Sequence, residues 1–216
     1  MLFKSDIQVV GEANIEGIKI NGLPQLYRCD LEFAEAQNNP ELNRLLKAFN
    51  LSGKYKYISI DTRSHMLMEG MFPCIPGWHC DDFYRTDDLN QQPDLERVHE
   101  VAPALHHMMV IGTCSRTEFL TEDLQAPGPE LVQLDQGKNK PVYLWYDQML
   151  ESTQPKTMFV EPGKIYTFGP TAFHRGTAAT HNGWRYFIRI TESNHRQPKN
   201  EIRYQTQVYT SGRVSW

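Results

Sequence analysis

The hydrophobic positions of this chain recur mostly with the period of two that is typical of strands. Short apolar or alternating runs, bounded by turn residues, predict strands at 6–10, 15–20, 55–60, 63–70, 106–112, 117–120, 142–146, 157–160, 164–168, 184–191 and 205–210. One segment, at about 40–50, has a helical period, because its leucines and a phenylalanine follow at i, i+3, i+4 and i+7 after Asn39 and Pro40. The pattern predicts a mainly β fold, a sandwich or barrel, with one clear helix packed on a sheet.

The composition is that of an ordinary globular protein, since 40% of the 216 residues are hydrophobic and 22% are charged. No repeat, heptad or low-complexity run divides the chain, and proline and glycine are scattered rather than gathered in a linker. We therefore expect a single domain over 1–216. Two polar, proline-containing connections, 82–104 and 121–141, are longer than hairpin loops and are candidate binding loops.

The charge balance changes the range of expected partners. The 22 Lys and Arg against 26 Asp and Glu give a net charge of −4, which does not favour a nucleic-acid partner. No apolar run approaches the length of a membrane span, and the N-terminal segment lacks the pattern of a signal peptide. The four cysteines contain no C-x-x-C pair. We expect a cytoplasmic protein with reduced thiols and no membrane partner, whereas the oligomeric state stays open.

Two separate segments carry residue types suited to a metal. In an extended backbone the side chains of His79 and Asp81 share one face, although a His-x-Asp alone is weak. A second segment has a Pro-Gly turn, an apolar strand and a short loop that ends at His174, and Arg185 follows eleven residues later on a new strand. Two histidines and a carboxylate match the facial triad of non-haem Fe(II) oxygenases, while structural zinc sites are normally closed by four ligands.

These residues resemble the Fe(II)/2-oxoglutarate-dependent oxygenase superfamily. The resemblance consists of His79-x-Asp81, the Pro-Gly-x-Ile-x-x-Phe strand before His174, and the arginine after it, and it covers roughly 76–190. It implies a double-stranded β-helix, or jelly roll. The metal-binding core would then be 76–191, preceded by supporting strands and the helix in 1–75 and followed by a C-terminal strand and tail in 192–216.

The resemblance also implies roles for individual residues. His79, Asp81 and His174 would bind Fe(II), and Arg185 would hold the distal carboxylate of the cosubstrate 2-oxoglutarate through its planar guanidinium. Such enzymes release succinate and CO2 while they hydroxylate a second substrate. Arg189 lies on the same face of its strand and competes with Arg185 for the carboxylate.

The sequence departs from the family pattern at one position and leaves the substrate open. Gly176 stands where some relatives place a hydroxyl that contacts the cosubstrate. The second substrate is expected to be a small molecule or a side chain rather than a nucleic acid, and the acidic loop 82–104 slightly favours a neutral or cationic one. The alternatives are a non-catalytic cupin or jelly-roll binding module, and a cupin-type hydrolase or isomerase that has no need of Arg185.

Overall fold

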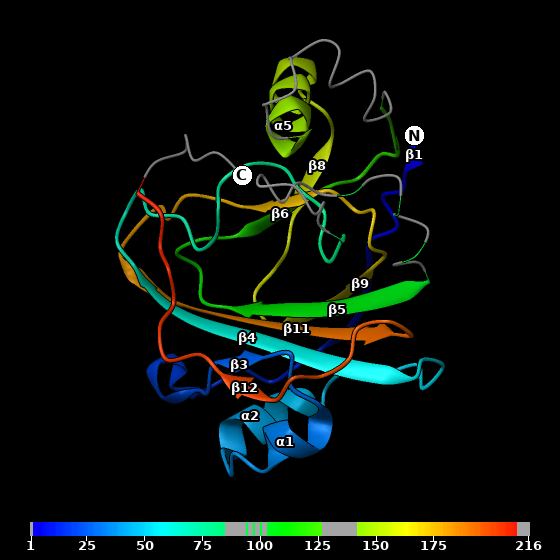
Figure 1. Cartoon of the computed structure of the whole chain (residues 1–216). Coiled ribbons are helices and arrows are strands. Elements are labelled where there is room, and N and C mark those ends of the chain that lie inside the picture. The colour runs from blue at the N-terminus through cyan, green and yellow to red at the C-terminus, as the bar shows by residue number, and fades with distance from the viewer. Residues whose placement is uncertain are drawn as a thin grey trace.

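A computed structural model of the chain describes residues 2–84, 103–126 and 142–210, together with Asp94, Arg97 and Glu100 (Figure 1). The greater part of each predicted loop, 82–104 and 121–141, lies outside the described residues, as does the end of the chain beyond 210. In the described part of the chain, no helix has the length and apolar character needed to cross a membrane.

Two antiparallel sheets form the body of the fold (Figure 1). The larger sheet has, in spatial order, β2 (Gln8–Glu12), β9 (Lys164–Phe168), β5 (Ala104–Ile111), β11 (Gly183–Ser193) and β4 (Tyr57–Leu67). The smaller sheet has β10 (His174–Gly176), β6 (Thr117–Leu120) and β8 (Thr157–Phe159). A single bridge from His79 to His174 extends the smaller sheet beyond β10.

The order of the strands along the chain defines the topology. From β4 the chain crosses to the bridge at His79, returns to β5, crosses to β6 and β8, returns to β9, crosses to β10 and returns to β11. This alternation between two facing sheets is that of a jelly roll. The predicted fold class, mainly β with a double-stranded β-helix core, is confirmed.

Short elements complete the described part of the fold. β1 (Leu2–Phe3) pairs with β7 (Leu124–Gln125), and β3 (Leu26–Tyr27) pairs with β12 (Glu201–Ile202). A 3-10 turn, η1, covers Ile20–Gly22. Because β3 lies beside the edge strand β4, the segments of β3 and β12 cover that edge (Figure 1).

The predicted helix is confirmed as α2 (Pro40–Leu46), although it ends earlier than expected. The Asn39 side chain accepts a hydrogen bond from the N–H of Leu42 (2.8 Å), which caps the first turn. A shorter helix, α1 (Leu31–Glu35), precedes it, and both cover the outer face of the larger sheet (Figure 1). The side chains between the helices and this face form the largest apolar cluster described. Because the hydrophobic core is on the outer face, the inner face of the same sheet can carry polar groups.

The strand predicted at 142–146 is wrong, because this segment begins the helix α5 (Val142–Thr153). Its aromatic residues favour a strand locally, but the buried side chains Tyr143, Tyr146 and Leu150 recur at helical spacing. They pack in one cluster with aromatic residues from other segments. Burial of one helical face therefore decides the structure here, and the expectation of a single clear helix is also corrected.

Other predicted strands differ in extent. The strands expected at 55–60 and 63–70 are one continuous strand, β4. The strand expected at 15–20 is absent, because Gly17 has a φ of 73° and turns the chain. In 205–210 no strand forms, and Tyr209 makes an isolated bridge to Phe72.

Gly112, which follows β5, offers a test of the packing between β5 and β11. Its φ is 98°, and a Cβ added there would lie 2.2 Å from the backbone carbonyl oxygen of Trp184. We expect Gly112→Ala to lower the free energy of unfolding by roughly 2–4 kcal/mol in urea denaturation, from strain and overpacking together. Gly53→Ala is the control, since Gly53 has a φ of 67° but open space around it. Equal losses in the two variants would show that the close approach contributes nothing.

Candidate functional site

The inner face of the larger sheet lines a cavity of about 890 Å³. In the middle of β4 and along β11 every second residue points into it. The register sets these residues in rows: His65 opposite Arg185, Arg63 opposite Phe187, and Asp61 opposite Arg189. The alternate residues of β11, such as Ile188 and Ile190, pack against the helices. The prediction that Arg185 and Arg189 share one face of this strand is confirmed.

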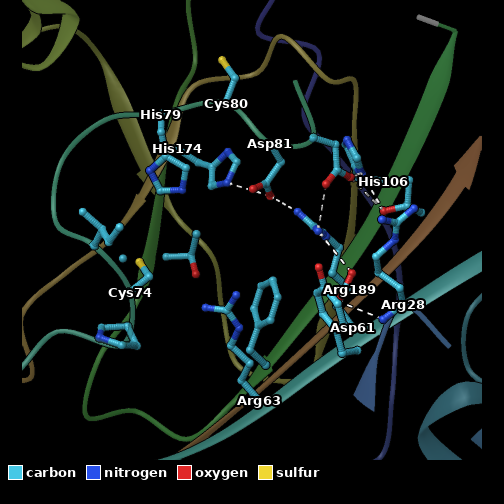
Figure 2. A pocket seen from close by; sticks show the side chains of 18 of the residues that line it. Arg28, Asp61, Arg63, Cys74, His79, Cys80, Asp81, His106, His174 and Arg189 are labelled. Carbon is cyan, nitrogen blue, oxygen red and sulfur yellow. Dashed lines mark hydrogen bonds and ion pairs between the residues drawn. The ribbon is translucent and has the colours of Figure 1, made fainter. Parts of the chain in front are cut away.

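The candidate metal ligands come together at the wall opposite that sheet (Figure 2). The backbones of His79 and His174 bond to each other, since each N–H donates to the other's carbonyl oxygen at 3.0 and 2.9 Å. Asp81 follows on the same face, and one possible ligand atom from each of the three residues lies within 4.8 Å of the others. In the described part of the chain this is the one group of three or more His, Cys, Asp or Glu with such spacing.

The orientation of the two imidazoles suits metal binding. The Nδ1–H of His79 donates to the carbonyl of Gly77 (2.9 Å), and that of His174 donates to the carbonyl of Ala172 (3.0 Å). Because a carbonyl oxygen only accepts, the proton of each neutral ring is on Nδ1 and the lone pair is on Nε2. Such a bond to the far nitrogen is the usual support for a metal-binding histidine.

The Nε2 of His174 lies 3.2 Å from Oδ2 of Asp81. Two lone-pair atoms at this distance repel each other unless a proton or a cation lies between them. Burial alone would raise the pKa of Asp81, but the positive charge of Arg189 outweighs it and holds that pKa well below its ordinary value. Burial lowers the pKa of His79 to about 4. An ionised carboxylate and a neutral imidazole are the forms that ligate a metal, so these residues fit an Fe(II) ion.

Aromatic side chains hold the metal-facing wall in place. Phe119 of β6 stacks on the ring of His174 with centroids 5.0 Å apart, and Phe168 of β9 meets the same ring edge-on at 5.5 Å. Both phenylalanines are buried. The imidazole of His174 therefore has little freedom to turn, and water is excluded from its far side.

Arg185 lies in the same cavity and is only 4% exposed. Its Nε donates to the carbonyl of Ser115 (3.3 Å) and its Nη2 donates to Oγ1 of Thr117 (2.9 Å). No described carboxylate lies within ion-pair distance of it. Burial lowers the pKa of Arg185 to about 10, so the guanidinium is still charged at neutral pH. A buried cation without a counter-charge is costly, and an anionic ligand would offset that cost.

Arg189 differs from Arg185 in this respect. It forms ion pairs with Asp81, with Asp61 (3.3 Å) and with Asp82 (3.3 Å). Burial alone would lower its pKa, but Asp81 and Asp61 raise it above the ordinary value. Because the protein's own carboxylates already surround Arg189, the geometry favours Arg185 as the group available to a ligand carboxylate.

The position that lacks the family's hydroxyl is explained by its surroundings. A Cβ at Gly176 would lie 2.7 Å from Sγ of Cys74, so there is no room for a side chain. Thr117 is the register partner of Gly176 across the smaller sheet, and its hydroxyl bonds Arg185. The cross-strand neighbour thus provides a hydroxyl beside the guanidinium. Sequence reasoning missed Thr117, because a strand was predicted at 117–120 but the run Thr-Glu-Phe-Leu does not alternate and so does not indicate which face is the inner one.

The adjacent histidines of β5 face opposite ways, as expected for a strand. His106 lines the cavity, and its Nδ1 lies 3.0 Å from Oγ1 of Thr191. His107 points to the other face and pairs with Glu192 at 2.8 Å. Of these two histidines, His106 therefore belongs to the site and His107 does not. His106 is a buried imidazole that lies outside the cluster of candidate metal ligands.

Comparisons with known proteins add little to this geometry. No family model and no curated protein matches the sequence. Among solved structures, the chain is similar to an N-substituted L-amino acid dioxygenase from Burkholderia ambifaria AMMD in complex with α-ketoglutarate. The identity is 13% and the TM-score 0.37, over 82% of this chain and 73% of that chain. The functional assignment therefore depends on the residues of this chain.

Proposed function

We propose that this chain is an Fe(II)- and 2-oxoglutarate-dependent oxygenase that hydroxylates a second substrate. His79, Asp81 and His174 would be the metal ligands, and Arg185 would bind the distal carboxylate of 2-oxoglutarate. The observation that carries the proposal is that Arg185, buried without a described counter-charge, shares one cavity with the His–Asp–His cluster. A binding module or a cupin-type hydrolase would use the cluster but has no need of that cation.

His79, Asp81 and His174 would hold the metal through three ligands, a number that would leave coordination positions for a cosubstrate and oxygen. When bound, Fe(II) supplies the redox chemistry that couples loss of CO2 from 2-oxoglutarate to oxidation of a C–H bond. The protein supplies geometry: the bonds from Nδ1 of His79 and His174 to backbone carbonyls fix the rings, and Arg189 holds the carboxylate of Asp81. These supports keep the donor atoms in place before any ligand enters.

Arg185 and Thr117 form the proposed cosubstrate subsite. The guanidinium offers parallel N–H groups to a carboxylate, and burial strengthens the resulting ion pair. The hydroxyl of Thr117 accepts from Arg185, so its own proton is available to donate to a second carboxylate oxygen. The expected ligand is therefore held by one cation and one hydroxyl at the end away from the metal.

The direct test is visible absorption of the anaerobic wild-type protein, titrated first with Fe(II) and then with 2-oxoglutarate. We expect a metal-to-ligand charge-transfer band that requires both additions, because the cosubstrate would chelate the metal at its open side. Calorimetric titration with 2-oxoglutarate, with and without metal, provides the control. If the protein binds metal but neither develops the band nor binds 2-oxoglutarate, the oxygenase proposal is wrong and a binding module or cupin-type hydrolase is favoured.

A further inference from the structure

The described lining of the cavity carries an excess of positive charge. It contains six arginines and three aspartates: Arg28, Arg63, Arg185, Arg189, Arg196, Arg203, Asp61, Asp81 and Asp82. No described lysine or glutamate lines it. A divalent metal and the 2-oxoglutarate dianion cancel each other, so an excess of three positive charges remains when both are bound. A cavity of this sign attracts an anion.

The aspartates are engaged mainly by two of these arginines. Asp61 pairs with Arg189 (3.3 Å) and Arg196 (3.1 Å), and Asp82 pairs with the same two residues. Burial alone would raise the pKa of Asp61, but Arg189 and then Arg196 outweigh it and lower that pKa. The negative charges of the cavity are therefore concentrated on one side of it, around Arg189 and Arg196.

Arg63 has no such partner. It lies on the floor of the cavity, opposite the wall with the candidate metal ligands (Figure 2), and no described residue forms an ion pair or hydrogen bond with its side chain. Its charge is close enough to lower the pKa values of Arg185 and Arg203 after burial has done so. Arg63 thus repels both of these arginines, and an anion bound beside it would relieve this repulsion.

Arg203 is the second cation of this group. It follows β12, and its guanidinium lies over the ring of Tyr27 at 4.2 Å, which fixes its plane. The nearest carboxylate described is Asp61, at 3.6 Å, and the Nε of Arg203 is buried without a hydrogen-bond partner among the described residues. A buried donor without a partner is costly, so Arg203 retains capacity for a ligand oxygen.

We propose that the second substrate is a small anion whose carboxylate, phosphate or sulfate group binds between Arg63 and Arg203. This inference rests on the proposed function, which assigns 2-oxoglutarate to Arg185 and so leaves the other two cations for another ligand. It replaces the expectation of a neutral or cationic substrate drawn from loop 82–104, most of which lies outside the described residues. The cavity, at about 890 Å³, is within the range of small-molecule sites.

The anchoring position also suits the reaction. Arg203 lies beside Asp61, Asp61 pairs with Arg189, and Arg189 pairs with the candidate ligand Asp81. The proposed anion site is therefore joined to the metal-facing wall through one continuous row of charged side chains. A substrate held by its anionic end at Arg63 and Arg203 extends the rest of its structure over the cavity toward that wall.

The test is calorimetric binding to the full chain loaded with Mn(II), a redox-inert stand-in for Fe(II), and saturated with 2-oxoglutarate. The probes are inorganic phosphate, phenyl phosphate and benzoate, with benzamide as the neutral control. We expect at least one oxyanion to bind and benzamide not to bind. Comparing the affinities of phenyl phosphate and benzoate shows whether the site prefers a phosphate or a carboxylate group. Arg63→Met and Arg203→Met should each weaken this binding at least about 10-fold. Arg44→Met, at an exposed position on α2, should not.

The outcomes separate this inference from the proposed function. If 2-oxoglutarate itself fails to bind the metal-loaded wild type, the proposed function fails, and the probes are then titrated alone against the same arginine variants. If 2-oxoglutarate binds but no oxyanion binds beside it, the anionic substrate is wrong. If the oxyanions compete with 2-oxoglutarate and are lost in Arg185→Met rather than in the other two variants, they occupy the cosubstrate subsite, which also overturns the inference. Thermal unfolding of each variant verifies that it is folded.

Discussion

Replacing His174 with alanine is expected to weaken Fe(II) or Mn(II) binding by at least about 100-fold and to remove the charge-transfer band. Loss of a residue that merely supports a ligand typically costs 10- to 100-fold, so loss of a ligand itself should cost more. Asp81 stays in position in this variant because Arg189 still pairs with it. The measurement is calorimetric titration with Mn(II), followed by the anaerobic absorption titration with Fe(II).

His106→Ala is the matched control for that variant. His106 is also a buried imidazole in the cavity and packs on Phe168, the same side chain that His174 meets, but it lies outside the cluster of candidate ligands. Both variants remove a ring of the same size from a similar environment. We expect metal affinity to change less than about threefold in His106→Ala. Equal losses in the two variants would indicate a packing effect and would remove His174 from the proposed metal site.

Local patterns in the sequence were sufficient for much of the fold. The strands at 117–120 and 164–168 have the predicted bounds, and the cap and first turn of α2 follow from Asn39 and Pro40. These elements depend on side chains within a few residues of one another. The helix α5 was missed because its residues favour a strand locally. The helix is stabilised by packing against aromatic side chains that are distant in sequence.

The candidate ligands were found in the sequence, but their meeting was not derivable from local patterns. His79 and His174 are brought together by a backbone bridge between segments far apart in the chain. Only the match of their residue types to a facial triad, and the resemblance to a family, linked the two segments beforehand. The structure supplies the physical reason, since the bridge extends the smaller sheet and turns both rings toward Asp81.

The distinction between Arg185 and Arg189 shows what the sequence leaves open. Both lie on one face of β11, and spacing alone favoured Arg185. The structure adds that the register sets Arg189 opposite Asp61, 128 residues away in sequence, and Arg185 opposite His65. Neither pairing has a signature in the sequence. Whether each arginine has a carboxylate beside it thus depends on the long-range register of the strands, and this decides whether the arginine is available to a ligand.

Replacing Arg185 with methionine is expected to raise the dissociation constant for 2-oxoglutarate by about 100-fold or more. Two charge-assisted hydrogen bonds, each worth about 1.5–3 kcal/mol, would be lost together. No described carboxylate pairs with Arg185, so its removal leaves no buried carboxylate without a counter-charge. The free energy of unfolding should therefore change little or increase. Calorimetric titration with 2-oxoglutarate and urea denaturation measure the two effects.

Thr117→Val tests the hydroxyl in the same subsite. It keeps the shape of the side chain and removes the group that accepts from Arg185, so we expect a loss of about 10-fold in 2-oxoglutarate affinity, smaller than that of Arg185→Met. The order of the two effects is the informative result. If Arg185→Met retained wild-type affinity while Arg63→Met lost it, the cosubstrate carboxylate would belong to Arg63. The cavity floor would then hold 2-oxoglutarate, and the second anion site would have to be abandoned.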